Sequence, residues 1–328
     1  MNLEKYLYLN GNYVVKVIGN YRLQKRCLRI GEDLVSAFPD SIDLKITNKC
    51  SWGCPFCHES SVKDGESFNL KETMEILSQL PKYPIEIAIG GGNVLDAPKV
   101  IDLMKWLDER GNRVRATVNI KDILSRRSDC QKIFPHVGAL GVSMDKMIDR
   151  KYVLKNWDGE YSLLNTIGGV EDLFYPELPN IVIHIIAGVF PYNELEELFE
   201  IANCPILVLG YKQWGRAKNT KLPDSLDKFK TTLHNIIIER RNENFSSFAS
   251  GKTIGFDNLA LEQLDIKSLL SDNEYEKLYM GDEGSHSMYI DAVKGEYART
   301  SRSDKRISWN NVELIEFFNS LQNDNSDY

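Results

Sequence analysis

The sequence has few cysteines for its length, no excess of positive charge and no long apolar run. Its 328 residues include 6 cysteines and 11 prolines, and 40 basic against 47 acidic residues give a formal charge of −7. This composition excludes a cysteine-dense secreted scaffold, a collagen-like chain and a disordered one. The acidic balance argues against nucleic acid as a partner. No apolar stretch approaches the roughly 18 residues that cross a membrane, so we expect no membrane contact.

The opening stretch MNLEKYLYLNGNY lacks the charged-then-apolar pattern of a secretion signal. We therefore expect a soluble, cytoplasmic protein. The pattern of apolar and polar residues changes twice along the sequence and predicts that the chain has three parts. Residues 1–40 form a β-rich segment with a hairpin signal at Asn10-Gly11. Residues 41–245 alternate short apolar runs with helical periods. Residues 246–328 form a C-terminal extension that contains the hairpin-like stretch SMYIDAVKGEYA and ends in a polar, frayed tail.

The middle part repeats a strand and then a helix about six times. The expected strands cover residues 42–46, 85–89, 114–118, 139–143, 181–186 and 206–209. The expected helices cover residues 69–80, 98–110, 121–134, 192–202 and 225–241, with a weaker one within 160–174. Such alternation predicts an α/β fold with a parallel sheet. The strands read as apolar on both faces, as in a sheet covered by helices. A barrel and an open doubly wound sheet fit this rhythm equally well.

Three of the six cysteines crowd into one short run, Cys50-Ser-Trp-Gly-Cys54-Pro-Phe-Cys57. The run follows the first strand of the α/β part, at the edge where active sites of parallel sheets form. Three thiolates can hold three irons of a [4Fe–4S] cube and leave the fourth iron open to another ligand. The alternative is a zinc site with His58 as fourth ligand, but zinc sites place their second ligand pair farther along the chain. The other three cysteines are expected to be buried small apolar residues.

At these residues the chain resembles the radical SAM superfamily. The family motif C-x3-C-x-φ-C, with an aromatic residue before the last cysteine, is met by Cys50, Cys54, Phe56 and Cys57. The resemblance covers about residues 42–215 and implies a partial (β/α)6 TIM-like barrel. It also implies one [4Fe–4S] cluster whose open iron binds S-adenosylmethionine (SAM). Reductive cleavage of SAM would give a 5′-deoxyadenosyl radical that takes hydrogen from a substrate, with a flavodoxin- or ferredoxin-type protein as reductant.

The run Gly90-Gly91-Gly92-Asn93 follows the second strand of the middle part. Glycines there let the backbone approach a ligand closely, although a plain turn has the same composition. Its place resembles the family's Gly-Gly-Glu motif, which binds the methionyl amino group. Asn93 stands where Glu is usual, and an amide oxygen still accepts a hydrogen bond from an ammonium group. The resemblance thus implies that Phe56, Gly91, Gly92 and Asn93 bind SAM.

Polar residues also close the later strands, where turn capping is the alternative reading. Asn119 closes the third strand, and Ser143 and Asp145 close the fourth, where family members place polar groups on SAM. His184, in a stretch that resembles the adenine-lining strand, is either a SAM contact or a core histidine. Lys212 and Arg216, near the end of the sixth strand, are candidate substrate contacts for a carboxylate or phosphate, or plain surface charges.

The stretch Trp214-Gly215-Arg216-Ala217 resembles a feature of peptide-modifying family members with a C-terminal cluster-binding extension, the SPASM group. Those extensions ligate further clusters through cysteines, and this chain has none after Cys204. The resemblance favours a peptide or protein substrate. A nucleotide or nucleoside substrate is the alternative and would need several cations together, with Lys212, Arg216 and Lys218 as candidates. A second alternative is a non-catalytic binding protein that keeps a metal as a structural clip.

Overall fold

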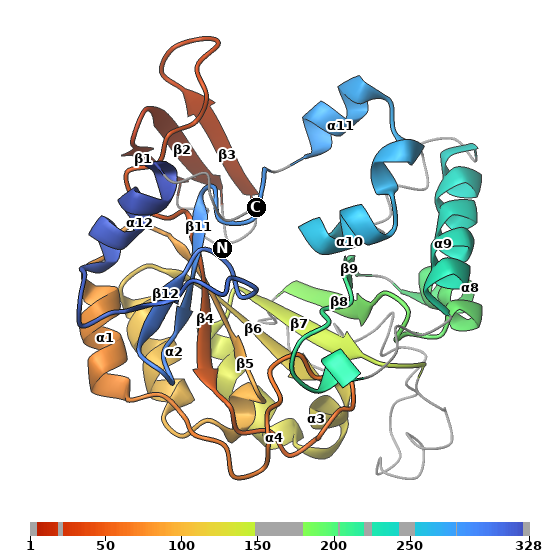
Figure 1. Ribbon diagram of the computed structural model, residues 1–328, viewed down its shortest axis with the longest axis horizontal. Helices are drawn as coiled ribbons and strands as arrows, with labels where there is room; N and C mark the ends of the chain where they lie inside the picture. Colours follow the sequence, from red (N-terminus) through yellow and green to blue (C-terminus); the bar gives the residue numbers. More distant parts are fainter. Residues whose placement is uncertain are drawn as a thin grey trace.

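The computed structural model describes residues 5–18, 22–147, 180–202, 204–219, 225–242, 253–279 and 281–323. A small antiparallel sheet opens the chain, in the order β1 (Lys5–Asn10), β2 (Tyr13–Ile18) and β3 (Arg22–Cys27). Gly11 turns the first hairpin with a φ of +61°, a conformation that favours glycine. The hairpin predicted at Asn10-Gly11 is confirmed. In Figure 1 the small sheet lies at the upper left, above β4 and α1.

A ten-stranded sheet forms the body of the protein, in the order β10-β9-β8-β7-β6-β5-β4-β11-β12-β13 (Figure 1). All neighbours from β10 to β11 are parallel, whereas β12 and β13 run antiparallel. The six predicted strands lie side by side in chain order. They are β4 (Ser41–Thr47), β5 (Glu86–Gly91), β6 (Arg113–Asn119), β7 (Ala139–Met144), β8 (Asn180–Ile186) and β9 (Ile206–Leu209).

The C-terminal part adds strands to both ends of this run. β10 (Ile254–Phe256) pairs with β9, while β11 (Ser287–Asp291) pairs with β4 and continues into β12 (Glu296–Ala298) and β13 (Ile307–Ser308). The β11–β12 hairpin turns at Gly295, which has a φ of +72°, as the sequence predicts. The joining of β11 to β4 was not predicted, because pairing between strands so far apart in the chain leaves no local pattern.

The helices follow the predicted rhythm with some differences. They are α1 (Leu70–Ser78), α2 (Val100–Glu109), α3 (Ile120–Ser125), α4 (Arg127–Ile133), α8 (Leu195–Ile201), α9 (Ser225–Asn242), α10 (Asn258–Gln263), α11 (Asp272–Leu278) and α12 (Leu314–Asn323). The single helix predicted over 121–134 is wrong, since Arg126 breaks it into α3 and α4. α12 was not predicted. The weak helix predicted within 160–174 lies outside the described residues.

The two faces of the large sheet differ in character. One face is apolar and packs against helices in a continuous core that includes Ile42, Leu103 and Met288. The other, here called the inner face, carries alternate residues such as Asp43, Glu86, Arg115, Thr117 and His184. In β6 these alternate residues are half-buried between fully buried ones. The expectation of strands that are apolar on both faces is therefore wrong for β4 and β6, because their second face carries polar and charged residues.

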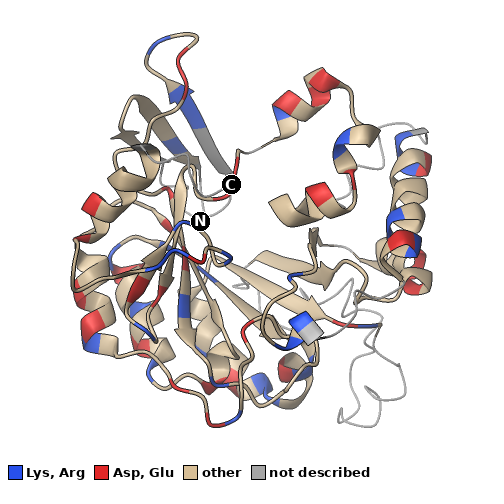
Figure 2. Ribbon diagram, viewed as in Figure 1, with Lys and Arg blue, Asp and Glu red and all other residues tan. Residues whose placement is uncertain are grey.

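No helix among the described residues is long and apolar enough to span a membrane. Lys and Arg are interspersed with Asp and Glu over the helices drawn in Figure 2.

Candidate functional site

The three clustered cysteines lie on the loop that follows β4, at the carboxyl edge of the parallel sheet. Cys50, Cys54 and Cys57 are all free and half-buried. Backbone hydrogen bonds shape the loop: Cys50 N donates to Val62 O at 2.8 Å and Cys57 N donates to Cys54 O at 3.2 Å. Gly53 adopts a φ of +60° between the first two cysteines. The loop thus presents three thiols within one short, internally bonded segment.

The donor set fits a cluster that leaves one iron without a protein thiolate. Cys130 and Cys204 are buried in the core of the large sheet, as predicted. Cys27, predicted to be buried, is only half-buried in the small sheet, where its Sγ donates to Glu32 O. No described group of three or more His, Cys, Asp or Glu side chains is arranged around a single ion. A [4Fe–4S] cube places each thiolate on a different iron, so it does not need thiols converging on one point.

Lys121 and Asp145 lie beside the cysteine loop. The Lys121 Nζ is 3.2 Å from an Asp145 carboxylate oxygen and 5.9 Å from the centre of the Trp52 ring. Burial raises the pKa of the Cys54 thiol, while the charge of Lys121 acts in the opposite direction. Metals bind the thiolate form of cysteine, so the ammonium group favours the form that a cluster needs.

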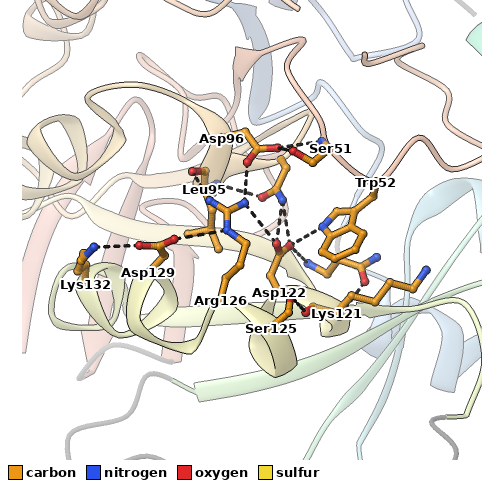
Figure 3. Close-up of polar contacts among 12 residues, drawn as sticks. Ser51, Trp52, Leu95, Asp96, Lys121, Asp122, Ser125, Arg126, Asp129 and Lys132 are labelled. Carbon is orange, nitrogen blue, oxygen red and sulfur yellow. Dashed lines mark hydrogen bonds and ion pairs between the residues drawn. The ribbon is translucent and has the colours of Figure 1, made fainter. Parts of the chain in front are cut away.

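A buried carboxylate, Asp122, joins three strand-end loops behind the cysteines (Figure 3). It accepts hydrogen bonds from Trp52 Nε1 at 3.0 Å, from Asn93 Nδ2 at 3.0 Å and from Asn119 N at 3.3 Å. Burial raises the pKa of its carboxyl, and the hydrogen bonds from Trp52 and Asn93 oppose that effect. Because Trp52 lies between Cys50 and Cys54, Asp122 ties the cysteine loop to the ends of β5 and β6.

A second carboxylate, Asp96, reinforces this connection. It accepts from both the backbone N and the Oγ of Ser51 at 2.9 Å, next to Cys50 (Figure 3). Its other oxygen lies 2.6 Å from Nη1 of Arg126, the residue that breaks the predicted helix. Arg126 also donates to Leu95 O at 3.0 Å. The break between α3 and α4 therefore brings the guanidinium group of Arg126 into contact with the loop after β5.

The glycine run after β5 packs closely on the cysteine loop. A Cβ at Gly91 would lie 2.4 Å from Thr47 O, and one at Gly92 would lie 2.2 Å from Lys49 O. A Cβ at Gly90 would meet nothing within 4 Å, so open space remains on that side. The amide of Asn93 has two partners inside the chain, since its oxygen accepts from Leu95 N and its nitrogen donates to Asp122. Asn93 is also buried, so its visible role is to hold the two loops together.

The polar residues predicted at the later strand ends have different surroundings. Asn119 caps α3 in a reciprocal capping box with Asp122, as in the turn-capping reading. Ser143 is half-buried and lies in register between Asn119 and His184. The His184 ring covers Gly141, where a Cβ would lie 2.3 Å from its Cε1. Burial lowers the pKa of His184 to about 4, so the ring is neutral at pH 7.

A pocket of about 520 Å³ separates the cysteine loop from the C-terminal hairpin. One wall holds a buried ion-pair group, in which Lys45 Nζ lies 2.5 Å from Glu59 and 3.2 Å from Asp291. Burial alone would raise the pKa of Glu59, but a hydrogen bond with His58 and the charge of Lys45 lower it to about 2. Lys212 lines the same pocket, and its Nζ donates to Ser301 Oγ at 3.0 Å.

The structure brings most of the predicted residues to one edge of the sheet. Phe56 is half-buried on the cysteine loop, Ser143 lies at the end of β7 with Asp145 directly after the strand, and Arg216 contacts the loop backbone. Sequence reasoning missed Trp52, Asp96 and Asp122. Only Asp122 left a signal, because Asn119-x-x-Asp122 is a capping-box pattern, but its hydrogen bonds to Trp52 and Asn93 are long-range.

No protein-family model and no curated protein matches the chain. Solved structures do match. SuiB from Streptococcus suis, bound to S-adenosylmethionine, gives a TM-score of 0.59 at 15% identity over 90% of this chain and 68% of SuiB. SuiB bound to its precursor peptide SuiA gives a TM-score of 0.60 at 14% identity, over 90% of this chain and 66% of SuiB. The protein anSMEcpe, with bound AdoMet and the Cp18Cys peptide, gives a TM-score of 0.52 at 11% identity, over 88% of this chain and 80% of anSMEcpe.

SuiB and anSMEcpe are radical SAM enzymes, and this chain spans about two thirds of the length of SuiB. At such low identity the similarity concerns the fold. The parallel sheet with a three-cysteine loop at its carboxyl edge thus has the same fold as SuiB and anSMEcpe.

Proposed function

We propose that this protein is a radical SAM enzyme with one [4Fe–4S] cluster and a peptide or protein substrate. The observation that carries the proposal is the placement of Cys50, Cys54 and Cys57. These three free thiols lie on the first loop at the carboxyl edge of a sheet that has the radical SAM fold. When bound, the cluster would supply the electron that cleaves SAM to methionine and the 5′-deoxyadenosyl radical, which takes a hydrogen atom from the substrate.

The chain's own residues would divide the remaining work. Ser143, Asp145 and His184 are proposed to contact SAM, because they lie at or near the carboxyl ends of β7 and β8. The neutral His184 ring suits an uncharged partner such as an adenine ring. Phe56, Gly91 and Gly92 are proposed to bind SAM from the loops that end β4 and β5. Asn93 and Asn119 are proposed to support that site through Asp122, since their side chains already have partners in the chain.

The surroundings favour a peptide substrate over a nucleotide. The two structural neighbours with the relevant ligands were solved with peptides, SuiA for SuiB and Cp18Cys for anSMEcpe. A triphosphate would need several cations together. Among the three candidates, Arg216 is bonded to loop carbonyls, Lys218 is exposed on η4 (Gly215–Asn219), and Lys212 donates to Ser301.

The pocket between the cysteine loop and the C-terminal hairpin is proposed to admit the substrate. Its walls carry both signs of charge, including Glu66, Lys294 and Arg306. Mixed charges match the alternating donors and acceptors of a peptide better than the uniform negative charge of a phosphate chain. A flavodoxin- or ferredoxin-type protein would deliver the electron, and the oxygen-sensitive cluster suits a reducing compartment such as the cytoplasm.

The proposal is tested by reconstituting the protein with iron and sulfide without oxygen, reducing it with dithionite and measuring 5′-deoxyadenosine. We expect product from the wild type and from Cys27→Ala, and none from Cys54→Ala. Cys27 is a matched control because it is also a half-buried cysteine but lies in the small sheet. If zinc binds to the three cysteines and iron does not load, the radical mechanism is wrong and the metal-clip reading replaces it.

A further inference from the structure

The segment after β9 lies directly on the cysteine loop. Arg216 N donates to Cys57 O at 3.0 Å, Arg216 Nε donates to Cys54 O at 3.0 Å, and Nη1 donates to Ser61 O at 2.7 Å. One residue therefore holds the carbonyls of two of the three cysteines and that of Ser61. It does so from a position 159 residues after Cys57 in the chain.

Gly215 makes this approach possible. It has a φ of +57°, and a Cβ at this position would lie 2.3 Å from His58 O. Any other residue would be strained and would push the loop away. The contact with His58 falls between the cysteine and Ser61 carbonyls that Arg216 holds, so the Gly215-Arg216 pair contacts the loop from Cys54 to Ser61.

The segment that carries Arg216 is itself fixed at its start. Tyr211 is almost completely buried, its N donates to Gln263 Oε1 at 2.8 Å, and its O accepts from Gln263 Nε2 at 3.0 Å. Gly210 N donates to Asp257 Oδ1 at 2.8 Å, and Ala217 is fully buried. A rigid support of this kind places the guanidinium before any metal binds, which is the condition for preorganising a ligand loop.

The charge of Arg216 has a second consequence. Three thiolates and a [4Fe–4S] cube carry net negative charge, and one-electron reduction adds one more negative charge. A cation beside the loop stabilises the more negative, reduced state and so raises the midpoint potential. A guanidinium is charged at any working pH, so this effect does not depend on titration.

We infer that Arg216 is a positioning residue for the iron–sulfur cluster rather than a contact for the substrate. Its hydrogen bonds hold the Cys54–Ser61 part of the loop in the shape that receives the cluster, and its charge favours the reduced cluster. This inference rests on the proposed function, because it requires a cluster on the three cysteines.

The test compares three variants after anaerobic reconstitution: Arg216→Gln, Arg216→Lys and Lys218→Gln. Lys218 is the matched control, since it carries the same charge on the same 3₁₀ turn but is exposed. The first measurement is the rate at which a chelator removes iron from the oxidised protein. The second is the midpoint potential of the cluster, followed by electron paramagnetic resonance while a titrant supplies one electron per cluster. Thermal unfolding of the metal-free variants reports whether each one folds.

We expect Arg216→Gln to lose iron about tenfold faster than the wild type, as for a lost charge-assisted hydrogen bond of about 1.4 kcal/mol. Its midpoint potential should move to a more negative value. Arg216→Lys should keep the potential, because it keeps the charge, but should lose iron faster, because an ammonium lacks the planar fork. Lys218→Gln should match the wild type in both measurements.

Wild-type iron loss and wild-type potential in Arg216→Gln would overturn the inference. If Arg216→Gln does not fold, Arg216→Lys decides, and wild-type iron retention in that variant would overturn the positioning role. Failure of the proposed function has a different pattern. In that case the wild type loads no cluster, or Cys54→Ala loads as much iron as the wild type.

Discussion

Removing the Asp122 carboxylate should both destabilise the fold and loosen the cysteine loop. Asp122 has no solvent-exposed surface and accepts from Trp52, Asn93 and Asn119 (Figure 3). Asp122→Ala leaves these donors without their acceptor, and each buried donor without a partner lowers the free energy of unfolding by about 1–3 kcal/mol. Trp52 is only half-buried, so water can replace part of its loss. We therefore expect the free energy of unfolding to fall by about 3–5 kcal/mol, a large share of a typical 5–15 kcal/mol.

The variant Asp122→Asn should recover little of this loss. An asparagine side chain would turn an NH2 group toward Asn93 Nδ2 or Trp52 Nε1, which are themselves donors. Asp129 provides the control, since it lies on the neighbouring helix α4, is 40% exposed and pairs with Lys132 and Arg126. Asp129→Ala should cost about 1 kcal/mol or less.

Urea unfolding of the metal-free proteins measures these differences, provided that the slope with denaturant stays constant. Iron bound after reconstitution gives a second readout, because Trp52 lies between two cluster cysteines. If Asp122→Ala costs no more than Asp129→Ala and loads as much iron as the wild type, the Asp122 network does not hold the loop and the reasoning is refuted.

Three further predictions concern particular contacts. The pKa of a histidine in the unfolded chain is about 6.5, and burial lowers the pKa of His184 in the folded protein to about 4. As the pH falls, the unfolded chain therefore binds this proton before the folded protein does. Stability should fall as pH drops from about 6.5 toward 4, by up to about 3 kcal/mol, and His184→Gln should lack this part of the loss in urea unfolding at several pH values. Gly141→Ala should cost about 1–3 kcal/mol, since its Cβ would come within 2.3 Å of the His184 ring, and a double-mutant cycle with His184→Ala should show coupling. Asn10→Ala should cost about 3 kcal/mol, because its buried amide bonds to Phe38 O, Asp40 and the N atoms of residues 37 and 38, and equal stability to wild type would contradict this.

The parts of the fold that the sequence predicts are those encoded locally. The alternation of apolar runs and helical periods predicts the strands β4 to β9. Asn69 and Gly111 mark the start of one helix and the end of another, and the structure confirms both. The cysteine spacing gives the loop that carries the site. In each case a short stretch of chain contains the whole signal, because the residues that determine the element are neighbours in sequence.

The remaining features depend on contacts between distant segments. The pairing of β11 with β4, the contact of Arg216 with Cys54 and the bond between Trp52 and Asp122 join residues from 70 to about 250 positions apart. Arg216 illustrates the difficulty. Its type and place predict a cation near the site, but the sequence alone cannot show that the guanidinium is bonded to loop carbonyls. Likewise, Arg126 lies in a helical period, and only the long-range pair with Asp96 shows why α3 and α4 separate there.

The central claim is that Cys50, Cys54 and Cys57 hold one [4Fe–4S] cluster with an iron open to SAM. The most direct measurement is the electron paramagnetic resonance spectrum of the reconstituted, dithionite-reduced protein before and after addition of SAM. The claim predicts the signal of a single reduced [4Fe–4S] cluster that changes when SAM is added, in the wild type and in Cys27→Ala but not in Cys54→Ala. A cluster signal that SAM leaves unchanged, or one that survives in Cys54→Ala, would contradict it.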